Sequence, residues 1–255
     1  MGAWETEAAL VRDFVARVSV AGGNPWTVYA ETAGWDLLLV HRDGYQVGIE
    51  AKLALNAKAI EQALSDQHSS YRLAGPDYRG ILVPAGKVQK HLGAICTAIG
   101  VRVIPMRDDK WYFPDLPNEA SNYGAWPNWC PGERCTLPDY VPDVEGGHAA
   151  PVALTPWKIK AIKLLVLLER RGVVCRRDMN LLQISPSRWT DAYLGFLAHD
   201  PGRKGYVACA RTPDLRAQHP VNYAEIEADW EKWGQPMFGD GKPVYPETLF
   251  ERSAP

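Results

Sequence analysis

An aspartate, a glutamate and a lysine stand close together in residues 34–52, which read GWDLLLVHRDGYQVGIEAK. Asp36 precedes an apolar run, and Glu50 and Lys52 follow a turn. Two neighbouring carboxylates repel, so one is expected to take up a proton unless a cation lies between them. A hard cation such as Mg²⁺ binds such oxygen ligands and keeps waters for a substrate. We therefore expect a metal site formed by Asp36, Glu50 and the main-chain carbonyl of Ala51.

Such a site is suited to the hydrolysis of phosphodiester bonds. A bound Mg²⁺ lowers the pKa of its water and neutralises charge that develops on a phosphate. Lys52 could orient the attacking water or hold a phosphate oxygen. The alternative is an ordinary cross-strand Glu–Lys–Asp cluster on a solvated sheet, because this spacing is a loose pattern.

The residues around the cluster predict a β-hairpin. The continuous apolar run Leu37 to Val40 is typical of a strand that is covered on both faces. Asp43-Gly44 favours a tight turn, because both residues tolerate positive φ. The following strand alternates, with Glu50 and Lys52 on one face. A turn at this place sets Asp36 opposite Glu50 or Ala51.

Further helices and strands are predicted on either side of the hairpin. Apolar periodicity predicts helices over residues 4–19, 57–73 and 87–99, and strands over residues 26–30, 78–84 and 101–105. The order is helix, three strands, helix, strand, helix, strand. This order predicts an α/β sandwich with crossover helices in residues 1–106.

These residues resemble the PD-(D/E)XK nuclease superfamily, which has the restriction-endonuclease-like fold. The resemblance covers roughly Trp4 to Met106 and is carried by Asp36, by Glu50-Ala51-Lys52, by the helix-borne Gln62 and by the element order. It implies a mixed sheet, Mg²⁺ or Mn²⁺ on Asp36 and Glu50, and a hydrolytic role for Lys52.

The same resemblance implies two further site residues. Gln62 is similar to a glutamine that two branches of the family place after the motif. A glutamate of the first helix often joins the site in this family. Glu7 fits that role best, Glu5 is second, and Glu31 is a further acidic candidate.

The composition is that of a globular protein. The chain has 255 residues, of which 46% are hydrophobic and 23% charged, and its apolar runs are too short to span a bilayer. The N-terminus lacks the pattern of a signal peptide. The chain has five cysteines. This odd number favours reduced thiols and a cytoplasmic location.

The net charge of −2 hides a basic block. Residues 157–216 hold twelve Lys/Arg and five Asp/Glu, a net of +7, while the residues before and after are acidic. Such a block indicates a polyanion partner such as DNA. The alternative is a solvated basic face with no partner.

A connector rich in proline and aromatic residues fills positions 107–154. Recurrent prolines disfavour regular elements there, and the aromatic side chains favour burial. We expect an ordered, irregular arm that packs on a domain or on a partner subunit.

Residues 155–255 are expected to form a mainly helical domain with an acidic tail. Three helices are predicted, from Thr155-Pro156 to Gly172, over residues 176–182 and over residues 188–198, then a basic turn at residues 201–205 and a strand. A last helix is predicted over residues 223–233. The helices, the turn and the charge resemble a winged helix-turn-helix.

That resemblance implies two sets of DNA contacts. The helix from Ser187 would enter a major groove, and basic residues around it would contact phosphates. The predicted DNA-binding residues are Lys158, Lys160, Arg176, Arg177, Ser187, Arg188, Thr190, Arg203 and Lys204, and Asp191 is placed near the base edges as well. The alternative is a helical subdomain that supports dimerisation.

Together these observations favour a metal-dependent endodeoxyribonuclease that acts on double-stranded DNA, most simply as a homodimer with one site for each strand. Two other hypotheses remain open. One is a nuclease fold without turnover that serves as a DNA-binding regulator or inhibitor. The other is a nuclease directed at particular structures or at RNA.

Overall fold

The computed structural model describes residues 4–20, 24–64, 74–109, 112–117, 126–144, 146–147 and 153–238. The chain divides into two compact units, Met1–Ala153 and Leu154–Pro255. Among the described helices, none has the length and apolar character needed to cross a membrane.

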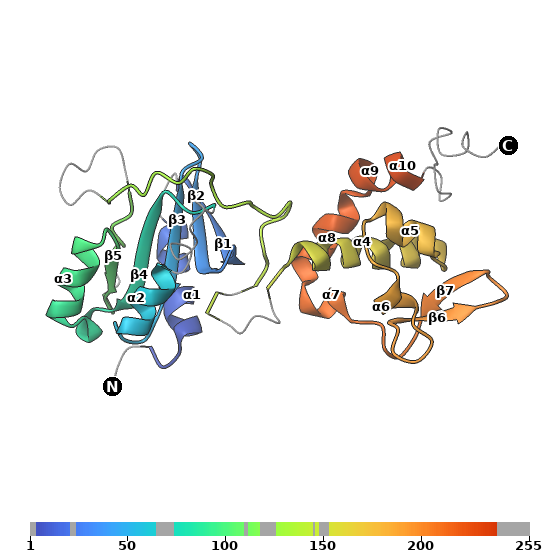
Figure 1. The fold of residues 1–255 in the computed structure, drawn as a ribbon, viewed down its shortest axis with the longest axis horizontal. Helices are drawn as coiled ribbons and strands as arrows, with labels where there is room; N and C mark the ends of the chain where they lie inside the picture. Colours follow the sequence, from blue (N-terminus) through green and yellow to red (C-terminus); the bar gives the residue numbers. More distant parts are fainter. Residues whose placement is uncertain are drawn as a thin grey trace. The chain divides into compact units, whose positions relative to one another are not determined.

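The first unit is built on a five-stranded mixed sheet in the order β1-β2-β3-β4-β5 (Figure 1). The β1–β2 and β2–β3 pairs are antiparallel, and the β3–β4 and β4–β5 pairs are parallel. The elements are α1 (Glu7–Val20), β1 (Trp26–Thr32), β2 (Trp35–His41), β3 (Gln46–Ala51), α2 (Ala57–Ala63), β4 (Tyr78–Pro84), the 3₁₀ turn η2 (Ala85–Lys87), α3 (Lys90–Ala98) and β5 (Arg102–Met106). The predicted element order and α/β class are confirmed.

The predicted hairpin is confirmed, and its register is fixed. Leu37 pairs with Ile49 and Leu38 with Gly48, so one more step along the ladder sets Asp36 opposite Glu50. Gly44 has φ +89°, and its N–H donates to the carbonyl of His41 to close the turn. The glycine supplies a positive φ at low steric cost.

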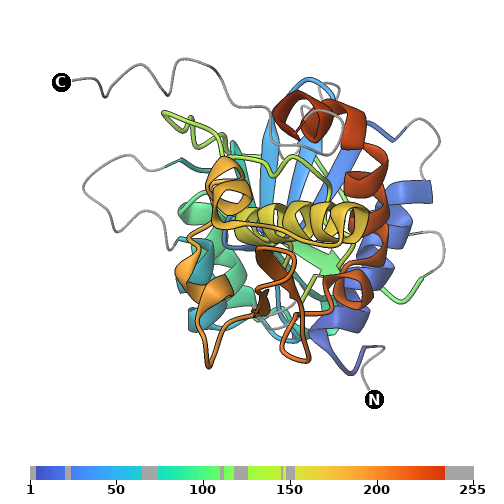
Figure 2. The same cartoon turned by 90° about the vertical axis from the view of Figure 1, so that its right-hand side faces the viewer.

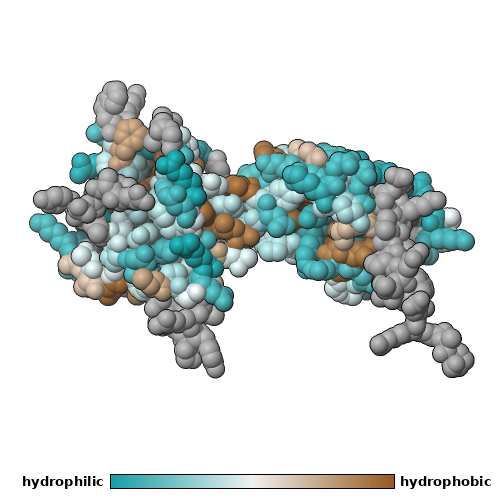
Figure 3. Space-filling view, turned by 90° about the horizontal axis from the view of Figure 1, so that it is seen from above, coloured by the Kyte–Doolittle hydropathy of each residue, from teal (hydrophilic) through white to brown (hydrophobic). Residues whose placement is uncertain are grey.

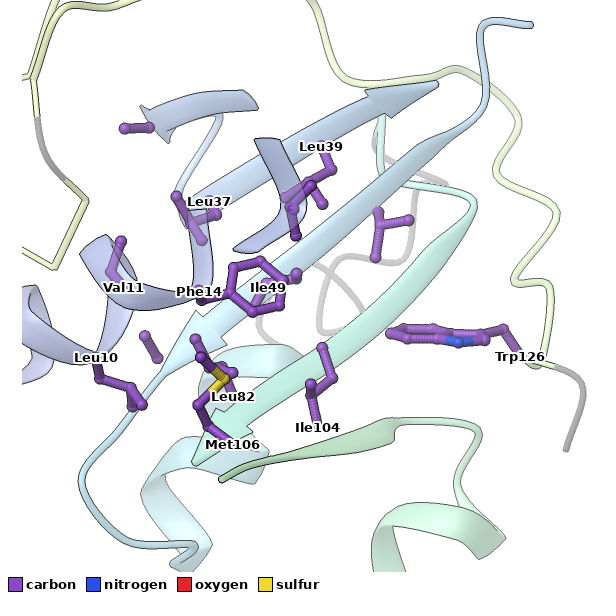
Figure 4. Close-up of a cluster of buried hydrophobic side chains, with 14 residues drawn as sticks. Leu10, Val11, Phe14, Leu37, Leu39, Ile49, Leu82, Ile104, Met106 and Trp126 are labelled. Carbon is purple, nitrogen blue, oxygen red and sulfur yellow. The ribbon is translucent and has the colours of Figure 1, made fainter. Parts of the chain in front are cut away.

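Each face of the sheet has its own apolar core. On one face α1 packs Leu10, Val11 and Phe14 against β2 and β3 residues such as Leu37 and Ile49, and Figure 4 shows Val11 and Phe14 pointing from the helix toward the strands. On the other face α2 and α3 pack against residues of β2 and β4. The sheet is therefore buried on both sides, as the apolar run in β2 predicts.

A glycine is required where the second core meets β3. Trp35 is buried at the start of β2, and a Cβ on Gly48 would lie 2.4 Å from its ring. The indole therefore occupies the space that any other side chain at position 48 would need. This packing holds the strand segment that carries Asp36.

The described part of the connector is an ordered arm without regular elements, as predicted. The buried Gln46 side chain donates to the Cys135 carbonyl and accepts from the Cys135 N–H, both at 2.9 Å. Arg134 makes two bonds to the buried Asp77, at 2.8 and 3.1 Å. The Trp129 N–H donates to the Asp77 carbonyl. The arm is thus held against the sheet of the first unit.

Two predicted helices differ in extent. The helix predicted over residues 57–73 is seen as Ala57–Ala63, and residues 65–73 lie outside the described chain. The helix predicted over residues 87–99 begins at Lys90, because residues 85–87 form a 3₁₀ turn.

The second unit is mainly helical. Its elements are α4 (Pro156–Arg171), α5 (Arg176–Leu181), α6 (Ser187–Thr190), β6 (Leu197–Asp200), β7 (Gly205–Ala208), α7 (Leu215–Gln218), α8 (Pro220–Ala228), α9 (Trp230–Trp233) and α10 (Gln235–Phe238). Figure 2 looks onto α4, which runs across the unit. The predicted ends of α4 are confirmed, because Thr155 caps its first turn and Gly172 follows it with φ +73°.

The helix predicted over residues 188–198 is wrong beyond Thr190. Asp191 leaves the helical region with ψ 136°, and its Oδ1 accepts from the N–H groups of Tyr193 and Leu194. A side chain that binds nearby backbone donors competes with the helix ladder. The chain therefore makes a tight turn and enters β6 at Leu197, whose pairing with β7 forms a hairpin.

The last predicted helix also differs. It begins at Pro220 rather than residue 223 and is interrupted at Asp229, so that α8 and α9 are separate helices.

Candidate functional site

Lys52 lies among three carboxylates where β2 and β3 meet. Its Nζ is 3.2 Å from Asp36 Oδ2, 3.5 Å from Glu50 Oε2 and 3.7 Å from Glu7 Oε2. The Ala51 N–H donates to Asp36 Oδ2 at 2.7 Å. The structure therefore brings four predicted site residues together, from α1, β2, β3 and the residue that follows β3.

The position of Glu50 is electrostatically costly. The residue is 4% exposed. Burial, and then the neighbouring Asp36 carboxylate, raise the pKa of Glu50 to about 7, although Lys52 acts in the opposite direction. A cation placed near Glu50 would lower its pKa again and so offset the effects of burial and of Asp36.

The same surroundings also raise the pKa of Lys52. Burial alone lowers the pKa of its ammonium group, but Asp36, Glu7 and Glu50 outweigh that effect and raise it. The lysine is therefore charged over the whole physiological pH range. A permanent positive charge suits the binding of a phosphate oxygen rather than the removal of a proton.

The structure distinguishes the three candidate glutamates. Glu7, the first residue of α1, reaches Lys52. Glu31 raises the pKa of Glu50 slightly through its charge, and its Oε1 accepts the N–H of Gly147 at 2.7 Å. Glu5 is exposed.

The connector reaches this site, which no pattern in the sequence indicates. A Cβ on Gly146 would lie 2.6 Å from the Asp36 carbonyl, and one on Gly147 would lie 3.0 Å from the Ala8 nitrogen. These two glycines therefore lie directly against β2 and the start of α1. A pair of adjacent glycines is a signal of close backbone approach, but it does not name the partner.

Gln62 lies on α2, and among the described residues its buried Oε1 has no hydrogen-bond partner. Burying such an acceptor without a partner is costly. None of the contacts described for Asp36, Glu50 and Lys52 involves this side chain.

The oxygen set predicted for a metal is compatible with Mg²⁺ or Mn²⁺. Asp36 and Glu50 lie on paired strands, and the pKa of Glu50 is raised first by burial and then by the Asp36 carboxylate. Over the described residues there is no group of three or more His, Cys, Asp or Glu side chains arranged for a metal. The predicted set differs from such a group, because it has two carboxylates and the carbonyl of Ala51.

The predicted DNA-binding residues lie on α4, α5, α6 and the β6–β7 turn. Two are engaged on α4, where Lys158 Nζ is 3.0 Å from His219 Nε2 and Lys160 donates to Gln183. Arg203 donates to the Gly172 carbonyl and pairs with Asp200. The remaining members are Arg176 and Arg177 at the start of α5, Ser187, Arg188 and Thr190 in α6, and Lys204 in the turn.

Comparison with protein-family models, with curated proteins and with solved structures finds no significant match to this chain.

Proposed function

We propose that this protein is a metal-dependent endodeoxyribonuclease. The first unit would hydrolyse phosphodiester bonds, and the second would bind the duplex. The observation that carries the proposal is the position of Lys52, within 3.7 Å of three carboxylates that include the buried Glu50. The αβββαβαβ order around this cluster fits the restriction-endonuclease-like fold.

Asp36, Glu50 and the Ala51 carbonyl are the residues that would hold Mg²⁺ or Mn²⁺. When bound, the ion would lower the pKa of a water and neutralise charge on the phosphate. The Ala51 N–H fixes one oxygen of Asp36. The Lys52 ammonium is suited to donate to a phosphate oxygen or to orient the attacking water.

The second unit supports a duplex as the substrate. The order of α4, α5, α6 and the β6–β7 hairpin fits a winged helix, and an isolated β-bridge joins Val174 to Tyr206 of the hairpin. On the face seen in Figure 3 this unit is mostly hydrophilic. A homodimer would present one site to each strand.

The test is cleavage of plasmid DNA by the full chain with Mg²⁺ or Mn²⁺. Wild type should nick and linearise the plasmid, leaving 5′-phosphate ends, whereas Asp36→Asn and Lys52→Met should be inactive although both still fold. Glu61→Gln, an exposed change on α2, is the matched control and should retain activity. Equal inertness of all four proteins while the duplex still binds would exclude the enzyme.

A second candidate is a nuclease fold that binds DNA without cutting it. It is favoured by one observation, because the Lys52 ammonium already pairs with all three carboxylates. In that case Mg²⁺ would not raise the melting temperature of the protein, and Lys52→Met would lower its stability rather than its activity.

A further inference from the structure

Two large apolar side chains stand exposed side by side on the turn that follows α6. Tyr193 is 86% exposed and Leu194 is 79% exposed, more than any other large hydrophobic side chain in the described chain. Single exposed apolar residues are common on protein surfaces. Two adjacent ones, so far exposed, indicate a surface that contacts something else.

The turn that displays them is held in shape. Asp191 Oδ1 accepts the N–H groups of Tyr193 at 2.9 Å and Leu194 at 2.7 Å. These bonds hold the pKa of Asp191 below its usual value, so it remains an acceptor at neutral pH. The Gly195 N–H donates to the Asp191 carbonyl, and a Cβ on Gly195 would lie 2.4 Å from that oxygen.

The neighbouring loop supports the turn from its other end. Arg211 Nε donates to the Gly195 carbonyl at 2.8 Å, and Thr212 Oγ1 donates to the Phe196 carbonyl at 2.7 Å. Because the backbone is fixed on both sides, Tyr193 and Leu194 need little further ordering to bind a partner.

The charge around the turn favours a nucleic acid over a protein surface. Arg188 lies one helical turn before it, over the rings of Trp157 and Phe196, and Arg211 lies against its end. Both arginines are exposed, in a segment of net charge +7. Apolar side chains within a cationic surface are typical of sites that stack on bases while arginines contact phosphates.

We infer that Tyr193 and Leu194 form a base-stacking wedge beside α6, and that the preferred substrate is duplex DNA with an unpaired or unstacked base. This inference rests on the proposed function of the second unit. A regular duplex offers no open base face, and inserting a side chain there costs unstacking energy. A bulge or mismatch has lost that stacking already.

The test is binding of the full chain to two fluorescent duplexes of equal length, one fully paired and one with a single-base bulge. EDTA prevents cleavage, and anisotropy is measured at two salt concentrations. A second bulged duplex carries 2-aminopurine at the bulge, so that its fluorescence reports stacking. Wild type should bind the bulged duplex roughly tenfold more tightly, the size expected for one stacked base.

The variants separate stacking from general affinity. Tyr193→Ala should lose the preference for the bulged duplex and the 2-aminopurine response, but it should bind the paired duplex as wild type does. Leu194→Ala should lose part of the preference for the bulged duplex. Tyr193→Phe keeps a ring and should keep the preference. Val221→Ala, which trims another exposed apolar residue, should change nothing. Equal melting temperatures show that the variants are folded.

Three results would overturn the inference. One is equal affinity of wild type for the paired and the bulged duplex. Another is a preference for the bulged duplex that survives Tyr193→Ala. In both cases the protein must still bind duplex DNA in a salt-sensitive way. A third is a Tyr193→Ala protein that changes oligomeric state in sedimentation but binds both duplexes as wild type, which would make the pair a self-association surface. If wild type binds neither duplex, the proposed function of the second unit fails with the inference.

Discussion

At the scale of single residues, the candidate site is a balance between burial and charge. Glu50 is buried beside a second carboxylate, and its pKa is raised to about 7 as a result. Lys52 offsets part of that cost through its contact at 3.5 Å. Such an arrangement stores an electrostatic penalty that a bound cation would remove.

The raised pKa of Glu50 makes stability depend on pH. Its folded-state pKa exceeds the unfolded value of 4.5, so the folded state holds the proton more tightly. The stability that this proton contributes is present below pH 4.5 and is lost as pH rises through 7. In EDTA, wild type should therefore lose on the order of 2 kcal/mol relative to Glu50→Gln between pH 5 and pH 8. Urea unfolding at both values measures this, and equal losses in the two proteins would contradict it.

The geometry also predicts which glutamate matters for cleavage. Glu7 lies 3.7 Å from Lys52, whereas Glu5 is exposed nearby in sequence. Glu7→Gln should lower the rate of plasmid cleavage roughly tenfold, the effect of losing one partly screened charge at that distance. Glu5→Gln is the matched control and should stay within about twofold of wild type. If Glu5→Gln lowered the cleavage rate more than Glu7→Gln, Glu5 rather than Glu7 would be the third carboxylate of the site.

At the scale of elements, the site depends on a hairpin held by packing on both faces. The α1 residues cover one face, while Trp35 fills the space above Gly48 on the other. Asp36 follows Trp35 directly, so the position of the indole determines where the carboxylate lies. The connector adds to this support, because Gly146 lies against the Asp36 carbonyl.

Gly48→Ala is expected to destabilise the first unit. The new Cβ would stand 2.4 Å from the Trp35 ring, and such overpacking costs about 1–3 kcal/mol. Gly86→Ala is a matched control, since its Cβ would meet nothing within 4 Å. Chemical denaturation measures both, and Mg²⁺-dependent cleavage should fall only in Gly48→Ala. Equal stability of the two variants would show that the indole can move aside.

At the scale of the whole molecule, the two units each have a core of their own. In the second unit α8 completes the fold, because the Tyr223 hydroxyl donates to Glu169 of α4 at 2.9 Å and both Tyr223 and Ile226 are buried. Burial and the Glu169 carboxylate raise the pKa of Tyr223, so this bond persists at alkaline pH. The basic block of residues 157–216 is thus only part of a folding unit.

A fragment of residues 154–238 should therefore unfold cooperatively, and one of residues 154–216 should not. The shorter fragment lacks the buried side chains of Tyr223, Ile226 and Phe238, each worth about 2 kcal/mol of burial. Circular dichroism melts distinguish the two fragments. Cooperative melting of the shorter fragment would show that α8 is dispensable.

The local features of the chain could be predicted from its sequence. The hairpin that carries Asp36, Glu50 and Lys52 follows from alternation and an Asp-Gly turn, and the ends of α4 follow from Thr155 and Gly172. These signals depend on backbone conformation and on residues a few positions apart. The apolar spacing of residues 188–198 predicts a longer helix than α6, because the spacing does not include the bonds that Asp191 makes to the next turn.

Only the tertiary structure shows which residues come together in the site. Strand pairing decided that Asp36 stands opposite Glu50 rather than Ala51. The packing of α1 brought Glu7 to Lys52, and the return of the connector placed Gly147 on Glu31. These contacts join residues up to 116 positions apart. They depend on how whole elements pack, which no short pattern in the sequence specifies.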